Sequence, residues 1–333
     1  MKNKIITFLV ILIATIIVLY FSLKDDYVTI INTIFSINKF WFLFSFLLLF
    51  SYYILRSISI HSITKEFNKQ FKLKDAFRLV LETNFFHAVT PFATGGQPYE
   101  IYYLNKNKVN LPDAIAISIS NFIVYQVALV FLGIVAIIAN QIFGIITSGF
   151  LKKLITLGFI INFAVIVILL WISKAKKTDK NIVYFIIDLL HKIRIVKDEK
   201  ALKEKFKLYL KDFNSGSELL FKNNKKFIIL VLLQLISLIA LYLIPFCLFL
   251  GTNINNIHPT TSIIIMSYVM LIGSFVPIPG GTGGLEYGFV TFFGKYITSS
   301  KLNAIMLVWR FITYYFGMIL GAIILNVKKE NKQ

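Results

Sequence analysis

Two copies of one short motif contain most of the residues in this chain that could do chemistry. Residues 91–96 read Pro-Phe-Ala-Thr-Gly-Gly and residues 279–284 read Pro-Gly-Gly-Thr-Gly-Gly, so both fit Pro-x-x-Thr-Gly-Gly, 188 positions apart. Proline opposes a continuous helix, and glycine adopts backbone angles closed to other residues. In an apolar chain, such breaks persist where they are buried in protein or line a wet cavity. Paired breaks in two halves of a membrane protein indicate a transport site, and two packing turns of chance similarity are the alternative.

An acid closely follows each motif, and an arginine lies inside the last apolar segment. Glu100 comes four residues after the first Gly-Gly, and Glu286 comes two residues after the second. Glu286 suits a helix cap, a contact to a cationic headgroup or a partner for an arginine. Arg310 lies roughly 12 Å into the last helix, where we expect it to pair with either acid or to bind a lipid phosphate. Arg56, near the end of an earlier helix, fits a snorkelling side chain.

The candidate site therefore combines the two breaks with the last helix. Backbone amides exposed where a helix begins suit an anion such as a lipid phosphate. We expect substrate-binding contacts from eleven residues: Asn84, Thr94, Gly95, Gly96, Glu100, Thr282, Gly283, Gly284, Glu286, Arg310 and Tyr314. The lipid path is expected to be lined by Tyr99, Tyr102, Tyr103 and Tyr287.

Other chemistries find no support in the sequence. The four histidines lack zinc-ligand spacing, and the single cysteine, Cys247, lies in an apolar run and suits a buried packing role. No nucleophile elbow, Walker loop or dinucleotide fingerprint occurs. The sequence therefore predicts no catalytic residue, no metal and no cofactor.

Composition places these residues in a membrane. The chain has 333 residues, of which 57% are hydrophobic, and its mean hydropathy is +0.75. We predict an all-α polytopic membrane protein with a single integral membrane domain over 1–333 and a possible inverted repeat. About seven spanning helices are expected, each approaching the roughly 20 residues that cross a bilayer, at 4–23, 40–60, 114–139, 154–173, 227–250, 260–276 and 302–327. Two re-entrant or discontinuous segments, 80–104 and 277–299, contain the breaks.

The net charge of +19 predicts the orientation rather than nucleic-acid binding. Basic residues gather after the second helix, at 174–226 and at the C-terminus, whereas 251–259 carries no charge. This pattern predicts a multi-pass protein of the bacterial cytoplasmic membrane with both termini in the cytoplasm. The loop 174–226 fits amphipathic helices on the cytoplasmic leaflet and, equally, a solvated helix pair.

Three features together resemble the lysylphosphatidylglycerol synthase transmembrane-domain family, the membrane part of the multiple peptide resistance factor. They are Asn84…Pro91-x-x-x-Gly95-Gly96-x-x-x-Glu100, Pro279-Gly280-Gly281-x-Gly283-Gly284-x-Glu286 and Arg310-x-x-Thr313-Tyr314-Tyr315. The resemblance covers about residues 1–327. One departure is Gln97-Pro98-Tyr99-Glu100, where many relatives place an arginine.

The resemblance implies a lipid translocase that moves an anionic or aminoacylated phospholipid, such as lysyl-phosphatidylglycerol, between leaflets. In two-domain relatives a separate soluble domain makes that lipid, and we expect this chain to lack it and not to be an enzyme by itself. The alternatives are a phosphatidylglycerol lysyltransferase or a subunit of one, working with a separate soluble synthase, a flippase for a polyprenyl-phosphate glycan carrier, and a membrane scaffold that binds partners through 174–226. A homo-oligomer is compatible with all of them.

Overall fold

The computed structural model describes residues 27–145, 149–174, 223–274, 276–297 and 299–327, and within these ranges it contains helices and no strands. The predicted all-α membrane class is therefore confirmed. Among the described residues, five stretches are long and apolar enough to cross a membrane: Lys39–Thr64, Leu111–Phe143, Gly149–Leu169, Asn224–Gly251 and Ser300–Asn326. The helix predicted at 4–23 and most of the loop 174–226 lie outside the described residues.

The first half of the described chain begins with α2 and ends with α7. Its helices are α2 Tyr27–Ser36, α3 Lys39–Thr64, α4 Leu73–Val89, α5 Gly96–Lys106, α6 Leu111–Phe143 and α7 Gly149–Lys174, with the 3-10 turn η1 Pro91–Ala93 between α4 and α5. Asparagine side chains accept backbone N–H groups at the starts of α3 and α6, which satisfies donors left free at a helix N-terminus.

The second half contains the same kinds of element. Its helices are α10 Asn224–Tyr242, α11 Ile244–Gly251, α12 Pro259–Gly273, α13 Gly284–Phe293, α14 Ser299–Arg310 and α15 Gly317–Asn326. The 3-10 turn η3 Pro279–Gly281 separates α12 from α13, and the π-helical turn η4 Phe311–Phe316 joins α14 to α15. The last spanning helix thus carries a π-helical turn directly after Arg310.

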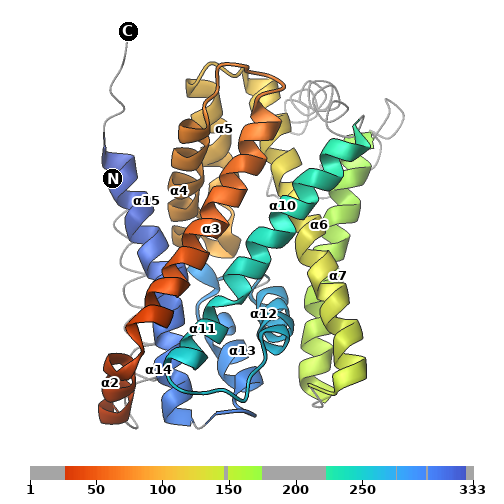
Figure 1. Ribbon diagram of the computed structural model, residues 1–333. Coiled ribbons are helices and arrows are strands. Elements are labelled where there is room, and N and C mark those ends of the chain that lie inside the picture. Colours follow the sequence, from red (N-terminus) through yellow and green to blue (C-terminus); the bar gives the residue numbers. More distant parts are fainter. Residues whose placement is uncertain (1–26, 146–148, 175–222, 275, 298, 328–333) are drawn as a thin grey trace, which may run out of the picture.

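Each predicted break forms the tip of a helical hairpin. The pair α4 and α5 occupies the upper half of the bundle, and the pair α12 and α13 occupies the lower half (Figure 1). Their tips, η1 and η3, contact each other between the two hairpins. The helix predicted at 260–276 ends at Gly273 after 15 residues. It is short of the roughly 20 residues of a span because it is the first arm of the second hairpin.

The two halves repeat one order of elements in opposite directions. A long helix precedes a hairpin, and another long helix follows it, in both halves. The long helices α3 and α10 pack against each other, and α3 runs upward in Figure 1 whereas α10 runs downward. The starts of α3 and α10 are 185 residues apart, and the starts of α6 and α14 are 188 apart, as are the two prolines of the motif. The architecture is that of an inverted repeat.

Candidate functional site

The two motif turns match in backbone geometry between the proline and the threonine, and they diverge after it, because ψ is -14° at Thr94 and 138° at Thr282. In each, the proline carbonyl accepts hydrogen bonds from the threonine amide and the threonine hydroxyl. The two residues between them have left-handed φ angles, 54° and 53° at Phe92 and Ala93 and 66° and 64° at Gly280 and Gly281. Left-handed angles cost an L-residue with a Cβ roughly 1–2 kcal/mol. The first turn therefore stores strain that glycine avoids in the second.

At the second break a buried ion pair holds the turn in place. Glu286 Oε1 lies 2.6 Å from Arg310 Nε, and Glu286 Oε2 accepts a 2.7 Å hydrogen bond from the Gly283 amide. Arg310 Nη2 also donates to the Gly280 carbonyl at 3.1 Å and to Thr282 Oγ1 at 3.3 Å. Glu286 is thus both a helix cap and the partner of the buried arginine, as two of its three predicted roles require.

Tyr314 links this ion pair to the first hairpin. Its ring lies under the Arg310 guanidinium, 4.5 Å from the ring centre, and its hydroxyl donates a 3.0 Å hydrogen bond to the Ala88 carbonyl of α4. A Cβ at Gly280 would collide with the same ring. Glycine at that position lets the last helix, the second turn and the first hairpin meet.

Arg56 and Glu100 lie at the first break. Arg56 Nη1 donates to the Tyr52 hydroxyl at 2.9 Å, and its guanidinium lies 5.4 Å from the ring centres of Tyr52 and Tyr125. Its Nε is buried and has no hydrogen-bond partner within the described ranges. Glu100 is buried and accepts long bonds, 3.4 and 3.5 Å, from Asn121 Nδ2. Arg56 therefore does not merely snorkel; it offers an unused donor inside the protein.

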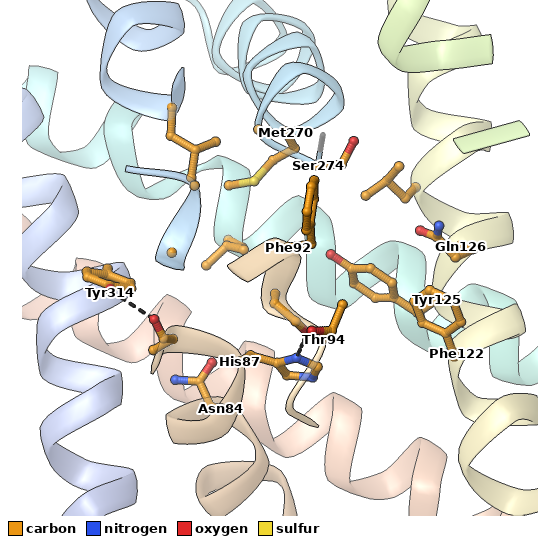
Figure 2. A pocket seen from close by; sticks show the side chains of 18 of the residues that line it. Asn84, His87, Phe92, Thr94, Phe122, Tyr125, Gln126, Met270, Ser274 and Tyr314 are labelled. Carbon is orange, nitrogen blue, oxygen red and sulfur yellow. Dashed lines mark hydrogen bonds between the residues drawn. The ribbon is translucent and has the colours of Figure 1, made fainter. Parts of the chain in front are cut away.

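A cavity of about 420 Å³ joins these two groups of residues. Side chains from α4, α6, α12 and the last helix point toward it (Figure 2). Five of the predicted site residues line it, namely Asn84, Thr94, Glu100, Arg310 and Tyr314. The other six, Gly95, Gly96, Thr282, Gly283, Gly284 and Glu286, are not among its lining residues. They shape the breaks and hold Arg310 in place.

The tyrosines expected along the lipid path are not among the residues that line this cavity. Tyr99 stacks on Phe86 and donates a 2.6 Å hydrogen bond to Glu82, Tyr103 is buried, and Tyr102 and Tyr287 are exposed on the outside of the bundle. The aromatic lining comes instead from Tyr52, Phe92, Phe122, Tyr125, Trp309 and Tyr314. Aromatic residues that follow a break in sequence need not face the space that the break creates.

Sequence reasoning also missed polar residues in α6 and α7 that line the cavity. Ser118, Asn121 and Gln126 lie in the 33-residue apolar helix α6, and Asn162 of α7 donates a 2.7 Å hydrogen bond to Oγ of Ser274, the residue that follows α12. Polar groups inside an apolar span are costly unless they are paired or functional. The contrast between these polar residues and the apolar helices around them was the signal in the sequence that could have identified them as cavity residues.

Comparison with known proteins gives two findings. Residues 6–321 match the family described as the lysylphosphatidylglycerol synthase TM region. A UPF0104 membrane protein of Archaeoglobus fulgidus is 22% identical over 288 residues, which are 85% of this chain and 84% of that protein. The family match takes in both hairpins and every described residue that lines the cavity.

Proposed function

The chain belongs to the family of the lysylphosphatidylglycerol synthase TM region, and from this premise we propose that it is a lipid translocase that moves an anionic or aminoacylated phospholipid between leaflets. The family and the apolar helices make it a multi-pass membrane protein, and the family connects it with lipid modification or transport. The translocase activity and the choice of lipid are our proposal.

One observation carries the proposal: a cavity between two opposed hairpins is lined by a half-buried arginine, Arg56, whose buried Nε donor is unused within the described residues. In the described part of the chain, Arg56 Nε has no hydrogen-bond partner and Arg56 forms no ion pair, whereas Arg310 Nε lies 2.6 Å from the Glu286 carboxylate. Arginine binds phosphate through several N–H groups at once, so Arg56 suits the phosphodiester of a headgroup. A cavity of about 420 Å³ has the size of a small-ligand pocket and would hold a headgroup while the acyl chains stay in lipid.

The inverted repeat suggests how the headgroup would cross. One hairpin enters from each side of the bundle, and their tips meet at the cavity. Rocking of one repeat against the other around a fixed central site exposes such a site to each side in turn. The distribution of Lys and Arg would place both termini at the cytoplasmic face of the cell membrane.

Lipid movement in proteoliposomes tests the proposal. Purified protein would be reconstituted with acyl-labelled phosphatidylglycerol, lysyl-phosphatidylglycerol or an uncharged glycolipid, and flipping would be followed by a quencher that reaches only the outer leaflet. We expect flipping of a phosphate-bearing lipid and none of the glycolipid. Arg56→Gln should reduce the rate at least tenfold, and Arg56→Lys should retain part of it because lysine keeps the charge without the fork of donors.

Lys69→Gln is the matched control, since it removes an exposed cation outside the cavity. It should flip lipid at the wild-type rate. Equal flipping of all three lipids, or wild-type flipping by Arg56→Gln in folded protein, would contradict a headgroup site at Arg56.

A further inference from the structure

We propose that lipid movement through the cavity is coupled to protons and that Glu100 is the residue that takes up the proton. The inference rests on the proposed function, because it concerns what happens when an anionic headgroup enters the same cavity. It rests on the position, hydrogen-bond partners and charge of Glu100. This buried acid has no role in the proposed binding of phosphate by Arg56.

Glu100 lies in the first hairpin and has no cation within ion-pairing distance among the described residues. Glu100 is only 5% exposed. Asn121 Nδ2 donates to both of its carboxylate oxygens, at 3.5 Å to Oε1 and 3.4 Å to Oε2. The ion pairs of the described residues join Arg78 to Glu82, Lys226 to Glu66 and Arg310 to Glu286, and Glu100 takes part in none of them. A carboxylate in such surroundings is held only weakly in its charged form by its neighbours.

The contrast with Glu286 shows what a fixed acid looks like in this fold. Both oxygens of Glu286 have short contacts, one to Arg310 and one to the Gly283 amide. Both oxygens of Glu100 share one amide nitrogen at the limit of hydrogen-bonding distance. On Asn121, meanwhile, Oδ1 is buried and has no partner in the described residues. A protonated Glu100 gains an O–H donor, and rotation of the Asn121 amide would present that acceptor to it.

Charge balance in the cavity links the proton to the headgroup. Arg310 is neutralised by Glu286. Arg56 is the cation whose field acts on Glu100, so the charges of these two pairs sum to zero. A phosphodiester adds one negative charge and claims Arg56. Uptake of one proton by Glu100 then returns the site and its ligand to zero, the state that is least costly in a membrane. By thermodynamic linkage, protonation of Glu100 must equally favour binding of the anion.

The other titratable groups near Glu100 already have hydrogen-bond or ion-pair partners, or they lie on other helices. On α4, Glu82 pairs with Arg78 and accepts from Tyr99, and His87 is hydrogen-bonded through Nδ1 to the Ala93 carbonyl. The helices α3 and α6 contribute Tyr52, Tyr125 and the amide of Asn121. Among the described residues lining the cavity, Glu100 is the carboxyl group. One proton would therefore accompany each phosphodiester.

Calorimetry in buffers of different ionisation enthalpy counts that proton directly. Soluble dihexanoyl phosphatidylglycerol would be titrated into the full-length protein in uncharged detergent, because its phosphodiester does not itself titrate near neutral pH. We expect uptake of about one proton per headgroup bound by the wild type and by Asp113→Asn, a control acid that does not line the cavity. Glu100→Gln should show no proton uptake for each headgroup that it binds.

The possible results separate the two proposals. Binding by the wild type without proton uptake would overturn the coupling and leave the translocase intact. Absence of binding by the folded wild type would overturn both. Proton uptake that persists in Glu100→Gln and disappears in His87→Gln would assign the proton to the histidine instead. Displacement of the lipid by inorganic phosphate at comparable concentration would identify free phosphate, not a headgroup, as the ligand.

An infrared difference measurement keeps the inference testable if Glu100→Gln binds too weakly for calorimetry. Addition of the same lipid to the wild type should increase the absorption of protonated carboxyl groups, and Asp113→Asn should show the same increase. The increase should be absent in Arg56→Gln, because the headgroup no longer claims the positive charge that faces Glu100. No increase in the wild type at saturating lipid would overturn the inference.

Discussion

The two arginines that line the cavity differ in how many of their N–H donors already have partners. Arg310 spends its donors on Glu286, Gly280 and Thr282, and its charge is cancelled within contact distance. Arg56 has a hydrogen bond to one tyrosine, lies against two aromatic rings and keeps Nε free of any hydrogen bond in the described structure. Their environments suggest different work: Arg310 holds the second turn in shape, and Arg56 meets the ligand.

Removing Glu286 from its ion pair with Arg310 should therefore lower the stability of the fold, and lipid movement would be lost as a consequence. Glu286→Gln leaves Arg310 buried without a counter-charge, and breaking a buried pair from one side costs about 3–5 kcal/mol. Thermal unfolding in detergent should show a large loss of stability, with lipid movement lost together with the fold. Glu286→Gln combined with Arg310→Met should be more stable than the first change alone, because no charge is then left unpaired.

The ion pair between Lys226 and Glu66 provides the comparison, since Glu66 is exposed. Glu66→Gln should cost no more than about 1 kcal/mol, as exposed pairs do. A Glu286→Gln protein that unfolds at the wild-type temperature yet binds no lipid would show instead that Glu286 is a direct ligand.

At the scale of elements, the hairpin tips explain why the motif occurs twice. In each hairpin, proline begins the turn after the first arm, and two left-handed residues reverse the chain. Threonine then donates back to the proline carbonyl, and the helix restarts at the second glycine. The reversal is needed once from each side, so it recurs at the same position in each repeat. The acids do not recur: Glu100 and Glu286 occupy different turns of α5 and α13. Shape is thus shared between the halves, whereas charge is not.

Exchanging the middle residues of the two turns should shift stability in opposite directions. Ala93→Gly relieves a left-handed alanine and should stabilise the protein by up to about 1 kcal/mol. Gly281→Ala places a Cβ in the same conformation, with the Leu285 side chain 3.1 Å away, and should destabilise it by about 1–2 kcal/mol. Unfolding in detergent of the two single variants measures both effects. A loss of stability in Ala93→Gly would mean that the first turn does not carry this strain.

The breaks were predictable from sequence because proline and glycine act locally. That Arg310 needs a partner was also predictable, because a buried charge is costly, but the sequence left Glu286, Glu100 and a lipid phosphate as candidates. The role of Arg56 was not predictable. It depends on Tyr125, which comes from a different helix, and on a cavity that appears only when two hairpins meet. The same reason explains why the tyrosines expected along the lipid path do not line the cavity. Tertiary packing decides the direction of a side chain on a short helical arm.

At the scale of the whole molecule, the inverted repeat and the charge distribution together predict how the protein is oriented in the membrane. The first hairpin opens toward the lysine-rich loop that follows α3, and the second opens toward the uncharged loop after α11. Since basic loops stay in the cytoplasm, the first hairpin should enter from the cytoplasmic side and the second from outside. A translocase needs this arrangement, because each face must reach the cavity through its own hairpin.

Single cysteines can test this orientation because the native Cys247 is buried and provides a silent background. Lys69 and Asn255 are exposed and lie beyond the ends of α3 and α11. A maleimide that does not cross membranes should label Asn255→Cys in intact cells, and it should label Lys69→Cys only after permeabilisation. Labelling in the reverse order would invert the protein and assign the basic loops to the outside. Labelling of both positions from one side would contradict opposed hairpins and, with them, passage of a headgroup through a shared central cavity.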